Sequence, residues 1–194
     1  DRRAYQLAYF SLLMKARQYD RRFFSEDVKP QVYHPAGFPE GEEYGSLVKG
    51  DGLPPKPELS KDQLTIFDDY ERDLRVWNFK RLLAQKYDAV VTNPPYMGSS
   101  GMNAKMSEFV KKNYSDGKSD LFAVFIEKCG ELLKPTGYQA MITQPAWMFL
   151  SSYEKLRGQL IHRDIVNMAH LGARAFEEIG GEVVQTTAFV LSKR

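Results

Sequence analysis

Four consecutive residues, Asn93-Pro94-Pro95-Tyr96, suit the methylation of an exocyclic amine on an aromatic ring. The nitrogen lone pair of such an amine is delocalised into the ring, so the amine is a poor nucleophile. The side-chain oxygen of Asn93 and the main-chain carbonyl of Pro94 can each accept one of its N–H groups and favour a tetrahedral nitrogen. Because proline fixes φ and keeps the preceding residue extended, both acceptors are held rigidly. The motif therefore predicts catalysis by positioning.

Tyr96 adds a flat ring on which a base can stack. The amine of adenine is buried in base pairing, so the nucleotide must first leave the helix, and stacking offsets part of that cost of about a few kcal/mol. The alternative is that Asn93 to Tyr96 form only a proline-rich turn that ends a strand. The apolar run Ala89-Val90-Val91 just before the motif favours the functional interpretation.

The motif needs a strand in front of it, because ligands bind at the carboxyl ends of strands in open α/β sheets. Residues 87–92 form the short apolar run expected of a buried parallel strand. The remaining pattern predicts helices at 4–17, 64–86, 119–133 and 152–162, and strands at 138–143, 165–171 and 183–191. This alternation predicts an α/β fold with a Rossmann-like sheet, mostly parallel, with one antiparallel strand at the C-terminal end.

The amino-acid composition excludes several classes of protein. The 194 residues are 43% hydrophobic and 27% charged, with a net charge of +2, so no overall basic field marks a nucleic-acid binder. The single cysteine, Cys129, excludes a disulfide within the chain and is expected in the core of a helix. Without an apolar run that could span a membrane or serve as a signal peptide, we expect a cytoplasmic protein with no membrane contact. Prolines and glycines cluster in residues 21–60 and predict a long loop or insertion.

Residues 86–96, Lys-Tyr-Asp-Ala-Val-Val-Thr-Asn-Pro-Pro-Tyr, resemble the catalytic motif of amino-methyltransferases. Met97-Gly98 and Ser119-Asp120-Leu121-Phe122 resemble the large adenine-specific (N6) DNA methyltransferases of type IIG restriction–modification systems and of BREX phage defence, the PglX group. Residues 1–17 are similar to the part of that group just after its cofactor-ribose motif. The resemblance covers nearly the whole chain and is weakest in residues 21–60.

The resemblance implies S-adenosylmethionine as cofactor and double-stranded DNA with a flipped adenine as substrate. It makes Phe176 the candidate for the second aromatic ring that sandwiches the base, with a core aromatic as the equal alternative. Asp120 is expected to help form the base pocket. Trp147 could line that pocket, although a buried core aromatic is the safer expectation, as it is for Phe122.

The cofactor-binding part of this family is not found in the sequence. No glycine-rich loop follows a strand, and the resemblance places the ribose-binding acid just before Asp1. Asp51 is a weak candidate for contact with the adenine end of the cofactor. We therefore expect a single, incomplete catalytic domain over residues 1–194, truncated at its N-terminal strands and inactive alone. The strand at 87–92 should then have an exposed edge, covered by residues 21–60, by another chain or by self-association.

Two alternatives to DNA methylation stay open. The same pair of acceptors would suit an RNA adenine or a protein glutamine amide, whose nitrogen is equally delocalised. A flipped base needs a second stacking face, which Phe176 could supply, whereas an amide does not. The chain could also be a non-catalytic, DNA-binding portion with a vestigial pocket, although the intact motif from Asn93 to Tyr96 argues against decay.

Overall fold

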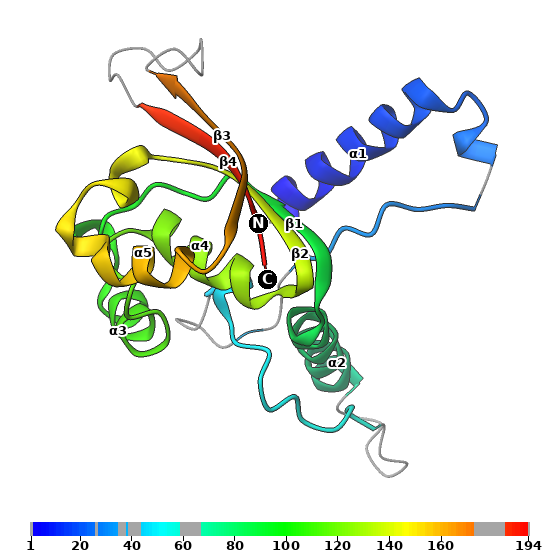
Figure 1. The fold of residues 1–194 in the computed structure, drawn as a ribbon. Helices are drawn as coiled ribbons and strands as arrows, with labels where there is room; N and C mark the ends of the chain where they lie inside the picture. The colour runs from blue at the N-terminus through cyan, green and yellow to red at the C-terminus, as the bar shows by residue number, and fades with distance from the viewer. Residues whose placement is uncertain are drawn as a thin grey trace. The chain divides into compact units, whose positions relative to one another are not determined.

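The computed structural model describes residues 2–25, 27–34, 38, 44–58, 67–172 and 185–193. The chain divides into two compact units (Figure 1). The first comprises residues 1–46 and 50–82, and the second comprises residues 47–49 and 83–194. The motif at Asn93 lies in the second unit.

The first unit contains two long helices, α1 (Arg2–Tyr19) and α2 (Phe67–Ala84), and both confirm helices predicted from the apolar pattern. The indole N–H of Trp77 on α2 donates to the Pro54 carbonyl at 2.8 Å and ties the proline-rich segment to that helix. Residues 31–34, which have β-forming side chains, form no strand. Pro30 lacks an amide hydrogen, and none of the sheet strands that the structure describes pairs with this segment.

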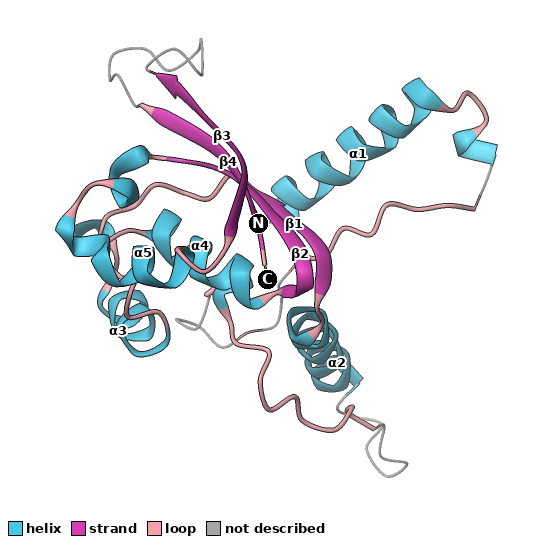
Figure 2. Ribbon diagram, in the orientation of Figure 1, coloured by secondary structure: helices cyan, strands magenta, loops and turns pink. Residues whose placement is uncertain are grey.

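The second unit is built on a four-stranded sheet with the order β1-β2-β4-β3 (Figure 2). Its strands are β1 (Tyr87–Thr92), β2 (Leu133–Thr143), β3 (Asp164–Gly172) and β4 (Thr186–Ser192). β1 and β2 pair in parallel, whereas β4 runs antiparallel to both of its neighbours. Three strands therefore share one direction and the last strand opposes them, which confirms the expected mixed α/β sheet. β1 forms one edge of this sheet among the residues that the structure describes.

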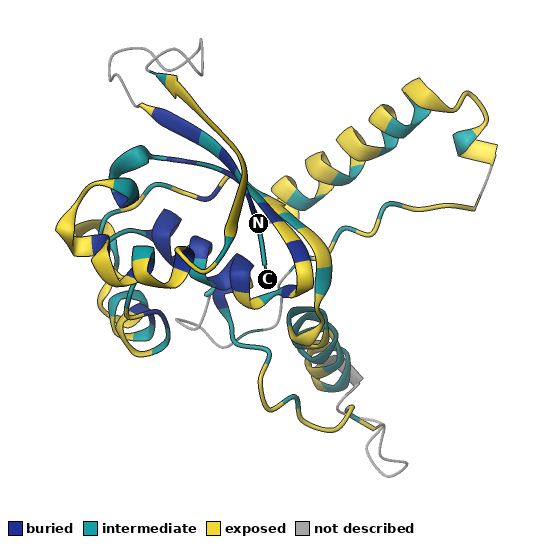
Figure 3. Ribbon diagram, viewed as in Figure 1, coloured by how far each residue is buried: buried dark blue, intermediate teal, exposed yellow. Residues whose placement is uncertain are grey.

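Helices pack on one face of the sheet and create the core there. α4 (Leu121–Glu131) and α5 (Glu154–Leu160) place Ile126 and Leu156 against Met141 of β2 and Phe189 of β4. Figure 3 shows this dense burial on α4 and the middle strands. The expectation for Cys129 is confirmed, because it lies in α4 with only 3% of its surface exposed.

One helix boundary and one additional helix differ from the sequence expectation. The helix predicted from residue 119 begins at Leu121 as α4, and its cap is Asp120, whose carboxylate accepts the Phe122 amide at 3.2 Å. The Ser119 carbonyl instead accepts the Ser99 amide at 2.9 Å, so its main chain is already committed to a neighbouring loop. The unpredicted helix α3 (Ala104–Asn113) is capped by Asn103, which accepts the Met106 amide at 2.8 Å.

Residues 47–49 are an exception to the predicted loop of residues 21–60. Leu47 is 2% exposed, and its carbonyl accepts the hydroxyl of Tyr114 at 2.5 Å. The Lys128 ammonium donates to the Val48 carbonyl at 2.9 Å, and Lys49 pairs with Glu131. These contacts make a short piece of the proline-rich segment part of the second unit.

Gly117, in the turn before α4, gives a sharp test of this packing. A Cβ there would lie 2.6 Å from the Ala123 carbonyl carbon, a main-chain atom that cannot rotate away. We expect Gly117→Ala to lower the free energy of unfolding by about 1–3 kcal/mol, as overpacking does. Urea denaturation of the full-length protein measures this change in the free energy of unfolding.

The matched control is Gly158→Ala on α5, where an added Cβ meets no atom within 4 Å. Alanine favours helix over glycine by about 0.5–1 kcal/mol, so this variant should be more stable than the wild type. If both substitutions raised the free energy of unfolding equally, the turn at Gly117 would have space for a Cβ atom.

Candidate active site

The motif residues leave the sheet directly from the end of β1. Thr92 is the last residue of that strand, and Asn93 follows it. The neighbouring strand β2 ends at Thr143 and is followed by Gln144 and by a short 3-10 helix, Pro145–Met148. Because β1 and β2 are parallel and adjacent, the two loops emerge from the same sheet edge.

The motif contains buried or half-buried residues, which can anchor its backbone, and exposed residues, which a substrate can reach. Asn93 and Pro95 are exposed, Pro94 is buried and Tyr96 is half-buried. The buried proline ring therefore fixes the backbone at the position whose carbonyl was predicted as an acceptor. The exposed amide of Asn93 is free of the core and available to a substrate.

Tyr96 is held between a strand and a helix. Its ring packs edge-on against Phe122 of α4, with centroids 6.1 Å apart and planes at 88°. Its hydroxyl lies 3.5 Å from the Ile142 carbonyl of β2, which it can reach as a long donor. Burial, followed by the nearby charge of Asp120, raises the pKa of Tyr96 above its ordinary value. The hydroxyl therefore stays protonated at neutral pH and the ring orientation is set by the core.

Asp120 contacts the motif loop through main-chain groups. One oxygen of its carboxylate accepts the Met97 amide at 3.0 Å as well as the Phe122 amide at 3.2 Å. Met97 is the residue directly after Tyr96. The structure thus brings Asp120 to the end of the motif that lies farther from β1.

Two aromatic residues considered at the sequence level lie in the core. Phe122 is 1% exposed and also contacts Tyr153, with ring centroids 5.8 Å apart. Trp147 is 5% exposed, packs against Phe189 and donates its indole N–H to the Thr143 hydroxyl at 3.1 Å. Their burial agrees with the safer expectation for both residues.

An apolar cavity of about 350 Å³ lies on the sheet face opposite α4 and α5, and the sequence analysis did not foresee it. Asn93 forms part of its wall. Residues of β2, β3 and β4 form most of the rest, among them Ala140, Ala169 and Ala188. The sequence signal was one alanine inside each of these three strands, where a short side chain leaves space above the sheet.

Two other candidate residues were named from the sequence. Phe176 lies outside the described residues. Asp51 is exposed in a turn of the first unit. Across the described ranges, no group of three or more His, Cys, Asp or Glu side chains could hold a metal ion.

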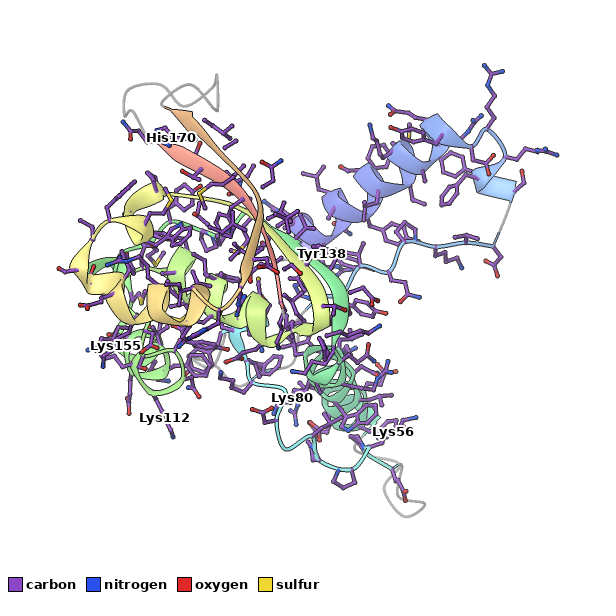
Figure 4. The ribbon with its side chains drawn as sticks, viewed as in Figure 1. Lys56, Lys80, Lys112, Tyr138, Lys155 and His170 are labelled. Atoms are coloured by element: carbon purple, nitrogen blue, oxygen red, sulfur yellow. The ribbon has the colours of Figure 1, made fainter. Side chains whose placement is uncertain are left out.

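Basic side chains of the second unit lie on helix surfaces. Lys111 and Lys112 occupy the last turn of α3 and are exposed. Figure 4 shows Lys112 on α3 and Lys155 on α5 at the surface of the molecule. In the part of the chain that the structure describes, no helix combines the length and apolar character needed to cross a membrane.

Sequence and structure comparisons place the chain among known proteins. Residues 1–176 match the family described as Eco57I restriction-modification methylase. The adenine-specific methyltransferase PglX of Lacticaseibacillus casei (strain Zhang) is 42% identical over 236 residues, which cover 100% of this chain and 20% of that protein. The adenine-specific methyltransferase BrxX of Escherichia coli O9:H4 (strain HS) is 59% identical over 111 residues, which cover 57% of this chain and 9% of that protein.

The chain thus spans a fifth or less of the length of these two relatives. Among solved structures, a Listeria monocytogenes protein described as a class I S-adenosylmethionine-dependent methyltransferase is similar to 64% of this chain over 40% of its own. Its sequence identity is 17% and the TM-score is 0.44.

Proposed function

This chain belongs to the Eco57I restriction-modification methylase family, and from that membership we propose that it methylates the N6 amine of adenine in DNA. The observation that carries the proposal is the motif at the end of β1, with Asn93 exposed and Tyr96 fixed against α4. The methyl donor of the family, S-adenosylmethionine, would supply the methyl group at its sulfonium centre. The biological setting we propose is restriction–modification, which the family description names, or phage defence, which the resemblance in sequence implies.

In this proposal the protein acts on the amine by positioning alone. The Asn93 side-chain oxygen and the Pro94 carbonyl accept the two N–H groups of the adenine amine. Both acceptors stand on a backbone that a buried proline and the end of β1 hold in place. The nitrogen lone pair is then directed away from the two acceptors, toward the methyl donor. The methylated nitrogen would release its extra proton to solvent, so no side chain has to titrate.

The flipped base would lie against Tyr96. Because the tyrosine hydroxyl and ring contact Ile142 and Phe122, the ring orientation would be fixed before a base stacks on it. We propose Phe176 as the opposing ring. We propose Asp120 and Trp147 as neighbours of the base pocket through the loops they support.

The described residues fit the amine substrate better than the cofactor. A glycine-rich turn after a strand lets the backbone approach a cofactor closely, but the turns after β1 and β2 carry Pro94, Pro95 and Pro145. Asp51 stays a proposal for the adenine end of S-adenosylmethionine. We propose that residues 1–194 form part of one catalytic domain and transfer no methyl group when isolated. We further propose that the β1 edge is covered by another part of the protein, another chain or a second copy.

The test is methyl transfer by the full-length protein from tritiated S-adenosylmethionine. Duplex DNA, RNA and a glutamine-containing peptide serve as parallel acceptors, and the labelled product is hydrolysed and separated by chromatography. We expect label only in N6-methyladenine from DNA, and none with isolated residues 1–194. If the label were found chiefly in RNA or in the peptide, that acceptor and not DNA would be the substrate. Transfer by the isolated segment would contradict its proposed inactivity.

A further inference from the structure

The loop after Tyr96 is paired to the start of α4 like a short antiparallel ladder. The Ser99 amide donates to the Ser119 carbonyl at 2.9 Å, and the Leu121 amide donates to the Met97 carbonyl at 3.0 Å. Between these bonds, Gly98 and Asp120 form an isolated antiparallel bridge. The main chain directly after the motif is therefore fixed to a buried helix.

The side chain of Asp120 completes this ladder. A single carboxylate oxygen accepts the amides of Met97 and Phe122, at 3.0 Å and 3.2 Å. Its negative charge lies at the N-terminus of α4, where the helix dipole favours an anion, and charge-assisted bonds are the stronger kind. The first turn of α4 after this cap is deeply buried, including Phe122 and Ala123, so the anchor itself cannot shift easily.

The motif is consequently held at both ends. On one side, Thr92 pairs with Met141 in the parallel ladder of β1 and β2. On the other side, Asp120 holds the Met97 amide, and two prolines stiffen the chain between these points. A shift of Met97 would be transmitted to Tyr96 and to both amine acceptors, because no flexible residue separates them.

We propose that Asp120 is a positioning residue for methyl transfer, which acts through the Met97 amide to hold Asn93 to Tyr96 in the reactive geometry. This role rests on the proposed function. It differs from contact with the base, because the carboxylate reaches the motif through a main-chain N–H group. It also differs from helix capping, because capping requires only the bond to Phe122.

Three substitutions separate these roles. Asp120→Ser keeps a good N-cap for Phe122, but its shorter side chain cannot also reach Met97. Asp120→Asn keeps an oxygen that can accept both amides. Asp120→Ala removes both bonds. The matched control, Asn103→Ala, removes the side-chain cap of α3, which bonds only Met106.

Steady-state kinetics of the full-length protein on duplex DNA provide the first readout. Asp120→Ser and Asp120→Ala should lower kcat by about 10- to 100-fold, as a misplacement on the order of 1 Å does, with the KM for S-adenosylmethionine unchanged. Asp120→Asn should restore kcat to within about threefold of the wild type, since it weakens the bonds without removing them. Asn103→Ala should leave kcat unchanged. A normal kcat in Asp120→Ser would overturn the proposal.

Amide hydrogen exchange provides a second readout that needs no substrate. The Met97 amide should exchange about tenfold faster or more in Asp120→Ser than in the wild type or in Asn103→Ala, because it has lost a charged acceptor. Unchanged exchange at Met97 would overturn the proposed role of Asp120 even if the wild type methylates DNA. A wild type without methyl transfer would instead sink the proposed function, and the two failures are therefore distinguishable.

Discussion

Asn93→Ala should lower the kcat of methyl transfer by about 10²–10³-fold, the loss typical when one polar group that stabilises a transition state is removed. The substitution deletes one of the two acceptors that hold the adenine amine, and the Pro94 carbonyl alone leaves the nitrogen free to turn. Asn93 is exposed, so the free energy of unfolding should change by less than about 0.5 kcal/mol. Initial rates of tritiated methyl transfer and urea denaturation of the full-length protein check both statements.

Asn167→Ala is the matched control for this variant. Asn167 stands on β3 in the wall of the same apolar cavity as Asn93, so both substitutions remove an amide from one cavity. Only Asn93 is adjacent to Pro94, and only its loss should affect kcat. Comparable losses of activity in the two variants would assign the effect to the cavity and would remove Asn93 from the acceptor pair.

The parts of the fold with local periodic patterns were predictable from sequence. The apolar run from Tyr87 to Thr92 predicted β1 to the residue. The expected burial of this strand was wrong, because none of its residues is buried and Val91 at the sheet edge is 75% exposed. The helices at α1 and α4 followed from apolar spacing. The resemblance to adenine-specific methyltransferases, read mainly from residues 86–147, is confirmed by the family match and by the PglX and BrxX relatives.

The parts that depend on long-range contacts were not predictable. Leu47 lies in a proline-rich stretch, and its burial depends on Tyr114, which is 67 residues away in sequence. α3 was missed because its sequence, Ala-Lys-Met-Ser-Glu-Phe-Val-Lys-Lys-Asn, is largely polar and only Val110 is buried. β2 begins at Leu133, ahead of Pro135 and Gly137, two residues that indicate a turn when considered alone.

The candidate site was predicted in its residue types and only partly in its roles. Asn93 and Tyr96 required only a strand in front of the motif, and the sequence supplied it. Asp120 was placed at the site through family resemblance. Its bond to the Met97 amide could not be predicted, because it depends on how a loop meets a helix 23 residues away. The start of α4 was also predicted two residues early, at residue 119, since Ser119 and Asp120 are both good N-cap types.

Phe122→Ala should lower the free energy of unfolding by about 3–5 kcal/mol, the usual cost of deleting a buried aromatic ring. Phe122 is 1% exposed and contacts Tyr153 on one side and Tyr96 on the other, so truncation leaves a cavity between α4 and the motif loop. Tyr96 would lose the ring that fixes its orientation, and kcat should fall even at temperatures where the variant is folded. Urea denaturation gives the stability, and methyl transfer measured well below the unfolding transition gives the activity.

The control is Phe149→Ala, the same substitution at a ring that is 74% exposed in the loop after the Pro145–Met148 helix. Its free energy of unfolding should stay within about 0.5 kcal/mol of the wild type, because little surface is removed from a packed environment. Phe122→Ala could also be less stable but folded and fully active. The Tyr96 ring would then be held only by its hydroxyl bond to Ile142 and by the bond from the Met97 amide to Asp120. If both variants were equally stable, the core under the motif would lie elsewhere than on α4. A loss of stability together with a loss of kcat in Phe122→Ala alone is the result that ties the core of the second unit to the geometry of Asn93 and Tyr96.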